Sequence, residues 1–250
     1  HVPYAGAGDV DGDGHGDFFF TAPRADWNGL LDSGMVLLVF GSASFPPEVD
    51  LEDPARSGTR VTRFLSEGPE YFTGTTVRTA GDLNGDGRED VAISAQGAPR
   101  EDGGLPFAGR VYVVFGGWDL SQDVALSSVG RAVPGVIIRG IEPGDILGWR
   151  LSRAGDLNGD GLDDLLVGTQ FRDDEQGEAY VIYGGTSLPS DIDLAVKGSW
   201  GVTVRGPPNR IRLAKEIAGT GDVNGDGLAD FLVASREEYP RGRAYLIYGS

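Results

Sequence analysis

The sequence predicts an all-β fold, a β-propeller built of four-stranded blades. Three observations support this prediction. A ten-residue acidic motif occurs four times, as GDVDGDGHGD from Gly8, GDLNGDGRED from Gly81, GDLNGDGLDD from Gly155 and GDVNGDGLAD from Gly221. Short apolar runs follow each copy in the same order. Glycine supplies 41 of the 250 residues, about twice the usual share of ~7%, which indicates many tight turns.

The apolar run directly after each motif predicts the second strand of a repeat. The four runs are Phe18 to Ala22, Val91 to Ala95, Leu165 to Thr169 and Phe231 to Ser235. Each is apolar at consecutive positions, so we expect both faces of this strand to be buried.

Further runs, rich in Val, Ile and Tyr and bounded by glycine, predict the other strands. Third strands are predicted at Gly34 to Gly41, Gly109 to Gly116, Gly177 to Gly184 and Gly242 to Gly249. Fourth strands are predicted at Thr59 to Leu65, Gly135 to Gly140 and Gly201 to Gly206. First strands lead into the motifs at about Tyr4 to Ala7, Thr75 to Asp82, Trp149 to Asp156 and Ala214 to Asp222.

These strands predict a single propeller region over residues 1–250, with repeats at about 1–65, 66–140, 141–206 and 207–250. The last repeat lacks its outer strand. Three explanations stay open: the repeats are part of a larger ring, another chain supplies the strand, or the edge remains unpaired. We therefore expect possible self-association, or pairing with a partner, through the last blade.

Charge and composition exclude several classes of partner. The formal net charge is −17, whereas a nucleic-acid-binding protein needs clustered Lys and Arg to displace counterions from phosphates. The chain contains no cysteine, so thiolate metal sites and a cysteine nucleophile are excluded. No apolar run approaches the ~18 residues that a membrane span requires, so we expect no membrane insertion.

The repeated motif has the donor pattern of a calcium loop. If the first Asp of each copy is position one, oxygen-bearing side chains stand at positions one, three, five and nine. Position seven varies, which suggests that it contributes a backbone carbonyl, and Gly at position six permits the sharp turn. In the first two loops the predicted ligands are Asp9, Asp11, Asp13, His15, Asp17 and Asp82, Asn84, Asp86, Arg88, Asp90. In the last two they are Asp156, Asn158, Asp160, Leu162, Asp164 and Asp222, Asn224, Asp226, Leu228, Asp230.

Six to eight oxygen donors suit Ca²⁺ better than Mg²⁺, which prefers a tighter octahedron and retains water. We therefore predict up to four Ca²⁺ ions. An EF-hand is excluded because it requires a bidentate Glu at position twelve and flanking helices. Position twelve is Phe20, Ile93, Val167 or Val233, already within the second strand. A solvated acidic turn would be the default interpretation of one copy, but four copies in register argue against it.

The motif, the apolar strand and the following G-x-x-Y-V-type strand resemble the FG-GAP repeat of integrin alpha-subunit β-propellers and their bacterial relatives. The Phe-Gly element survives partly at Tyr71 to Gly74 and at Ile146 to Trp149, with no clear equivalent before Asp222. The resemblance implies calcium in the loops between first and second strands, and ligands met by loops on the opposite face. Family propellers often have seven blades.

The expected function is that of a calcium-binding interaction module, extracellular or at the cell surface, which recognises a protein or a glycan. No catalytic motif is present, so we expect no enzyme activity. The alternative is a lectin or the scaffold of a carbohydrate-active enzyme such as a polysaccharide lyase. Ligand contacts are expected in the loops that do not repeat, including Phe171 to Glu178, Ser235 to Gly242 and the segment around Trp27.

Overall fold

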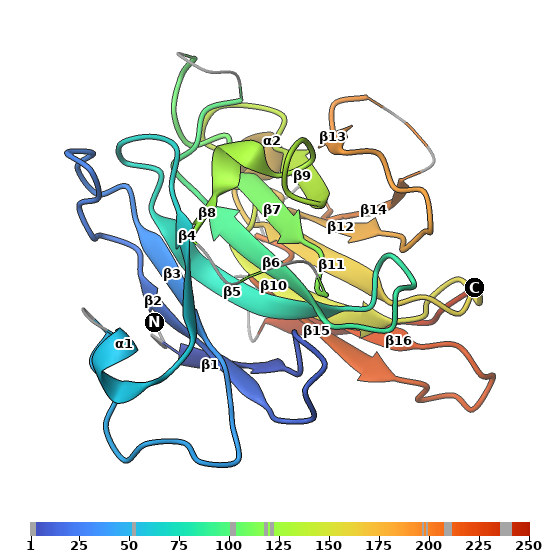
Figure 1. Cartoon of the computed structure of the whole chain (residues 1–250). Coiled ribbons are helices and arrows are strands. Elements are labelled where there is room, and N and C mark those ends of the chain that lie inside the picture. Colours follow the sequence, from blue (N-terminus) through green and yellow to red (C-terminus); the bar gives the residue numbers. More distant parts are fainter. Residues whose placement is uncertain are drawn as a thin grey trace.

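The computed structural model describes residues 4–51, 54–100, 104–117, 120, 123–196, 198, 200–207, 212–235 and 242–250. These residues form four mostly antiparallel sheets, here called blades 1 to 4, which follow one another along the chain (Figure 1). Among the described residues, helix is limited to α1 (Pro54–Ser57), α2 (Arg172–Glu175) and the 3-10 turn η1 (Leu126–Ser128). No helix there is both long and apolar enough to cross a membrane.

The strands of each blade are hydrogen-bonded in chain order, and the predicted all-β fold of four-stranded blades is confirmed. Blade 1 contains β1 (Tyr4–Gly8), β2 (Asp17–Ala22), β3 (Met35–Val39) and β4 (Val61–Leu65). Blade 2 contains β5 (Thr73–Gly81), β6 (Asp90–Ala95), β7 (Arg110–Val114) and β9 (Gly135–Arg139). Blade 3 contains β10 (Arg150–Gly155), β11 (Asp164–Thr169), β12 (Glu178–Ile182) and β14 (Gly201–Arg205). Blade 4 contains β15 (Glu216–Gly221), β16 (Asp230–Ser235) and β17 (Arg243–Ile247).

Two short strands that the sequence did not predict extend the outer edges of blades 1 and 2. β8 (Val124–Ala125) leaves the connection between β7 and β9 and pairs in parallel with β4 of the preceding blade. β13 (Asp191–Asp193) leaves the connection between β12 and β14 and pairs in parallel with β9. Val124 and Ile192 are buried in these contacts. Each of these connections therefore holds the outer edge of the blade before it.

Three apolar cores lie between successive blades. Phe19 and Leu38 of blade 1 share a core with Ile93 and Tyr112 of blade 2. Ala92 and Val113 on the other face of blade 2 belong to a core with Leu165 and Val167 of blade 3. Leu166 and Val181 of blade 3 pack with Phe231 and Val233 of blade 4. Single sheets thus bury their apolar faces by stacking, as repeat architectures require.

The prediction that every second strand is buried on both faces holds for β6 and β11, in which all residues are buried. It is wrong for the two end blades. Phe18 and Phe20 of β2 and Leu232 of β16 are only half-buried, because no blade in the described residues covers those faces. First strands contact first strands in the order β1, β5, β10, β15.

The turn before each first strand has the same unusual backbone in blades 2, 3 and 4. Phe72, Ile146 and Arg212 have φ of 50°, 57° and 50°, in the left-handed region. Two residues later Gly74, Gly148 and Ala214 also have positive φ. No sequence pattern marks this element before Asp222, because Arg212 and Ala214 replace the apolar residue and the glycine. Blade 4 therefore retains the backbone conformation of this turn, although its residues no longer match the sequence pattern.

The glycine that opens each third strand is required by a close approach of the next blade. Gly34, Gly109 and Gly177 have φ between 79° and 83°. A Cβ on Gly109 would overlap the backbone of Leu147, whose N–H donates to Ala108 O at 3.0 Å. Equivalent overlaps would occur with Thr73 and Leu213. The glycine therefore lets the start of one blade's third strand contact the chain that enters the next blade.

We expect Gly109→Ala to lower the free energy of unfolding by about 2–4 kcal/mol, because it adds a steric overlap to the left-handed strain. Gly144 is the matched control, since its φ is 90° and nothing lies within 4 Å of a Cβ placed there. Gly144→Ala should cost about 1 kcal/mol from strain alone. Equal losses in urea unfolding would contradict the proposed role of the close approach.

Candidate metal-binding loops

Four loops of the same geometry join the first strand of each blade to the second. In each, both oxygens of the position-one Asp accept hydrogen bonds from backbone N–H groups of the same loop. Asp156 Oδ1 accepts from Gly159 at 2.7 Å and Asp160 at 3.2 Å, and its Oδ2 accepts from Gly161 at 2.8 Å. Asp9, Asp82 and Asp222 make the same three bonds. Bonds of this kind, led by the one from Gly227, lower the pKa of Asp222.

Positions three and five continue the turn. The Oδ1 of Asn158 accepts from Asp160 N–H at 3.0 Å, and its Nδ2 donates to Asp160 Oδ2 at 2.9 Å. Asp160 Oδ1 accepts from Leu162 N–H at 2.9 Å. The same pattern recurs around Asn84 and Asn224. The glycine at position six has φ between 83° and 94° in all four loops, as the sharp turn requires.

The position-nine Asp links two distant parts of its blade. Asp164 Oδ2 accepts from Leu157 N–H at 2.8 Å, and its Oδ1 accepts from Gly184 N–H, just after β12, at 2.9 Å. Asp17, Asp90 and Asp230 make the equivalent pairs of bonds, all between 2.8 and 3.0 Å. All four side chains are buried. Each carboxylate therefore fastens its loop to the end of the third strand.

Burial shifts the pKa of these carboxyl groups. It raises the pKa of Asp90 to about 7 and that of Asp164 to about 6, although the backbone hydrogen bonds oppose the shift. Burial also raises the pKa of Asp17. The nearby charges of positions one and five add to the rise for Asp90 and Asp164. A divalent cation would lower the pKa of these carboxyl groups, because it compensates the clustered negative charge.

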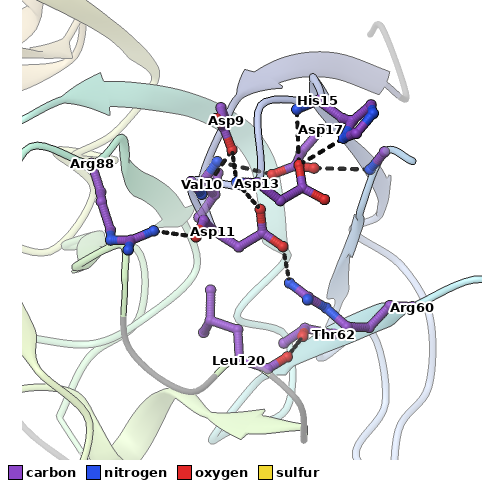
Figure 2. A network of polar contacts seen from close by, with 12 residues as sticks. Asp9, Val10, Asp11, Asp13, His15, Asp17, Arg60, Thr62, Arg88 and Leu120 are labelled. Carbon is purple, nitrogen blue, oxygen red and sulfur yellow. Dashed lines mark hydrogen bonds and ion pairs between the residues drawn. The ribbon is translucent and has the colours of Figure 1, made fainter. Parts of the chain in front are cut away.

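Carboxylates converge in the first loop (Figure 2). Oxygen atoms of Asp9, Asp11 and Asp17 lie within 4.8 Å of one another. The Arg60 guanidinium pairs with the Asp11 carboxylate, and Arg88 donates to the Asp11 backbone carbonyl (Figure 2). A donor set made only of oxygens, several of them charged, fits Ca²⁺. In the other loops an Asn at position three replaces one of these charges.

Neighbouring loops are in contact through positions that the motif leaves variable. Arg88, Leu162 and Leu228 at position seven lie over Gly12, Gly85 and Gly159 of the preceding loops. Glu89, Asp163 and Ala229, at position eight, lie over Gly8, Gly81 and Gly155. Asp163 Oδ2 also accepts from Asp82 N–H at 2.9 Å. The sequence assigned position seven only a carbonyl, so it missed this contact of the side chain.

The predicted ligand residues are therefore brought together loop by loop, with positions one, three and five around each turn and position nine buried beneath it. Their role as metal ligands stays a prediction. His15 Nδ1 lies 3.2 Å from Asp13 Oδ1, and the backbone bond from His15 lowers the pKa of Asp13.

The non-repeating loops differ in how far the structure describes them. Within Phe171 to Glu178, Arg172 pairs with Glu142 at 2.8 Å, and Glu178 accepts from Arg205 at 2.8 Å. Glu178 is buried, so this cluster is an ion-pair network and not a freely solvated loop. Residues 236–241 lie outside the described part of the chain. Trp27 is half-buried and forms a small bridge with Leu30.

Comparisons with known proteins identify repeats that coincide with the blades. The family model described as FG-GAP repeat matches residues 73–114, 148–182 and 216–247, which span the first three strands of blades 2, 3 and 4. Human phosphatidylinositol-glycan-specific phospholipase D is 32% identical over 214 residues, covering 82% of this chain and 24% of that protein. Drosophila melanogaster integrin alpha-PS2 is 29% identical over 221 residues, covering 84% and 14%. Xenopus laevis integrin alpha-5 is 30% identical over 182 residues, covering 69% and 15%. The chain spans about a quarter or less of these relatives.

We expect Asp164→Ala, measured with chelator present, to lower the free energy of unfolding by about 2–4 kcal/mol, because the N–H donors of the buried Leu157 and the half-buried Gly184 lose their acceptor. Asp160→Ala serves as the control in the same loop, since Asp160 is exposed and the two bonds that it accepts, from Leu162 N–H and Asn158 Nδ2, are exposed too. It should cost less than about 1 kcal/mol without metal. Equal effects in denaturant unfolding would contradict the link between loop and third strand.

Proposed function

Because the chain belongs to the FG-GAP repeat family, we propose that it is a calcium-binding recognition module that acts outside the cell or at its surface. The supporting observation is the set of four oxygen-rich loops, held in one geometry and in contact with one another along the blades. The resemblance to integrin alpha subunits supports the extracellular setting and a protein ligand. The calcium ions are structural in this proposal.

The physical role of calcium follows from the placement of the loops. Each groups three or four carboxylates beside a contact between neighbouring blades, where mutual repulsion opposes packing. A bound Ca²⁺ would hold positions one, three and five together through their oxygens and offset that repulsion. Sites in extracellular modules bind calcium at roughly 10⁻⁴–10⁻³ M, so such loops fill outside the cell.

The ligand surface that we propose lies at the ends of the blades opposite the calcium loops. There, a hollow of ≈ 510 Å³ is bordered by the starts of first strands. Its lining residues include Trp149, just before β10, Arg150 of β10 and Glu216 of β15. Arg150 pairs with Glu216 at 2.9 Å, so the hollow offers both charges and an aromatic ring. We propose that this surface binds and does not catalyse, in keeping with a sequence that has two histidines and no cysteine.

A lectin is the second candidate. Trp149 Nε1 is buried and has no hydrogen-bond partner among the described residues, which favours a ligand rich in hydroxyl groups. The proposed scaffold role in a carbohydrate-active enzyme would use the same surface. A glycan array, followed by assay for unsaturated sugar products, separates recognition of sugars from their cleavage; a protein ligand would give neither signal.

We expect calcium to raise the melting temperature and chelator to lower it. At a free concentration about a hundredfold above Kd, each ion adds roughly 2.7 kcal/mol. One site then shifts Tm by about 5–11 °C in a chain of this size. Calorimetric titration should give up to four ions per chain. A Tm that does not change when chelator is added would contradict the proposal.

Asp160→Asn tests one loop separately. The amide keeps an oxygen for the bond from Leu162 but removes the charge, so calcium stoichiometry should fall by one while Tm in chelator stays within about 2 °C of the parent protein. Glu48→Gln is the matched control, since Glu48 is an exposed carboxylate outside the loops. It should leave both the stoichiometry and the calcium-dependent Tm unchanged.

A further inference from the structure

At the ends opposite the acidic loops, successive blades meet in three equivalent junctions. In each junction, the residue two positions before the glycine that opens a third strand accepts a hydrogen bond through its backbone carbonyl. The donor is the N–H of the left-handed residue in the turn that enters the next blade, at 2.9–3.2 Å. All six residues have φ between 48° and 66°. The three pairs are Asp32 with Phe72, Phe107 with Ile146 and Glu175 with Arg212.

The junction between blades 3 and 4 is filled by an arginine that contacts an acid and an aromatic ring. Arg212 pairs with Glu175 at 2.9 Å, and its Cζ lies 5.3 Å from the centre of the Phe171 ring. Phe171 is the second residue after β11. An ion pair and a cation–π contact therefore occupy this junction.

The junction between blades 1 and 2 contains the same three residue types, with two of them exchanged. Arg24, the second residue after β2, holds the position of Phe171, and Phe72 holds that of Arg212. The Cζ of Arg24 lies 5.2 Å from the centre of the Phe72 ring, and its guanidinium lies 3.8 Å from Asp32. Both outer junctions are therefore occupied by an acid, an arginine and a phenylalanine in contact.

The middle junction, between blades 2 and 3, replaces all three residue types. Its positions hold Gly97, Phe107 and Ile146. Gly97 extends no side chain over the junction, and a Cβ there would overlap the Glu70 carbonyl oxygen. Phe107 and Ile146 are half-buried and belong to none of the three cores between blades. Positive φ is unfavourable for bulky and β-branched residues, so these two positions carry a cost that core packing does not offset.

A hollow of ≈ 310 Å³ opens beside the middle junction, a volume within the range of ligand sites. Phe72 and Phe107 stack in its wall, with ring centroids 6.1 Å apart. Ile146 also lines it, and its N–H donates to Phe107 O at 2.9 Å. The buried Gln96 of the lining donates through Nε2 to Gly148 O at 3.1 Å. The walls are therefore held by hydrogen bonds within the chain, and such preorganisation lowers the cost of binding.

The rim of the hollow is positive, although the net charge of the chain is −17. Arg24 is the charged residue of the lining, and its side chain is 78% exposed. Its 3.8 Å separation from Asp32 is too long for a hydrogen bond, so the guanidinium keeps donors for a ligand carboxylate. Leu31 and Leu105, in the loops that hold Asp32 and Phe107, are 58% and 70% exposed. They extend the apolar surface beyond the hollow, which suits a polypeptide.

We propose that this hollow is an anchor site for a protein ligand that presents an aromatic side chain next to a carboxylate. The ring contacts Phe107 and Ile146, and the carboxylate pairs with Arg24. This inference rests on the proposed function and narrows its ligand to a protein segment with one aromatic and one acidic residue. The hollow of ≈ 510 Å³ shares Thr75 and Gln96 with the anchor site, so residues that flank the anchor reach it.

Three acetylated and amidated tetrapeptides probe the site: Gly-Phe-Asp-Gly, Gly-Phe-Lys-Gly and Gly-Ala-Asp-Gly. Each is titrated into the whole chain in calcium-containing buffer, and binding is followed by saturation-transfer and chemical-shift NMR. We expect the Phe-Asp peptide to bind at least about fivefold more tightly than either of the others, because the ring supplies an apolar anchor and the carboxylate a charged hydrogen bond.

Arg24→Glu reverses the charge at the rim. It should weaken binding of the Phe-Asp peptide about three- to tenfold and strengthen binding of the Phe-Lys peptide, because the attraction of one charge becomes repulsion and the reverse. Arg56→Glu is the matched control, since the Arg56 side chain is 75% exposed and lies 3.9 Å from Asp50. It should leave the affinities of all three peptides unchanged.

Phe107→Ala removes one wall of the hollow and should weaken the Phe-Asp peptide about tenfold. Phe45→Ala is its control, since Phe45 is an exposed phenylalanine whose ring lies 5.9 Å from that of Phe18, away from the anchor site. Melting temperatures report whether each variant is folded. Arg24→Glu alters an exposed side chain, so it tests the site even if Phe107→Ala does not fold.

Failure of the anchor site and failure of the proposed function give different results. If calcium raises Tm but the Phe-Asp peptide binds no better than the Ala-Asp peptide, the anchor site alone is overturned. A preference for the Phe-Asp peptide that survives Arg24→Glu would also overturn it, as would a glycan-array signal without peptide binding. If the Phe-Asp peptide binds as expected while calcium leaves Tm unchanged, the anchor site stands and the proposed role of calcium does not.

Discussion

Each blade depends on one buried carboxylate. The position-nine Asp accepts one N–H from the start of its own loop and one from the turn after the third strand. It therefore fastens the acidic loop to the turn after the third strand, a link that the pairing of the strands does not itself provide. Burying a charge is costly, which is why the pKa of Asp90 and of Asp164 is raised. The cost is tolerated because both oxygens are hydrogen-bonded.

The second constraint is that a single sheet cannot bury two apolar faces by itself. Blades 2 and 3 solve this by stacking, and their second strands are fully buried. The acidic loops stand at the same corner of each blade, so stacking also places negative loops side by side. Direct contacts from positions seven and eight onto the glycines of the preceding loop make the loops part of the interface between blades. The geometry of the loops and the packing of the blades are coupled for this reason.

Repeated and non-repeated features lie at opposite ends of the blades. The acidic loops, the buried position-nine carboxylates and the strand-opening glycines recur, and each has a reason that lies in packing. The surface at the opposite ends of the blades does not recur: Thr76, Arg150 and Glu216 occupy equivalent places in β5, β10 and β15, with different chemistry at each. A scaffold whose stability comes from the repeated end leaves the other end free to vary.

Much of this protein was determined by local sequence. Alternation of glycine-bounded apolar runs specified the strands of the four blades, and the spacing of Asp, Asn and Gly specified the loops, because both depend on neighbours close along the chain. The FG-GAP resemblance followed from the same residues.

Tertiary structure decided the rest. β8 and β13 are too short to be recognised as strands alone, and they form because a neighbouring blade offers an edge. The glycines directly before position one and at position four have positive φ in all four loops. In the first three loops, side chains of the next blade also occupy the space that a Cβ would need, and backbone of the next blade does so at Gly109 before β7. Whether Phe20, Ile93 and Leu232 are buried was decided by stacking between blades, which no local pattern encodes.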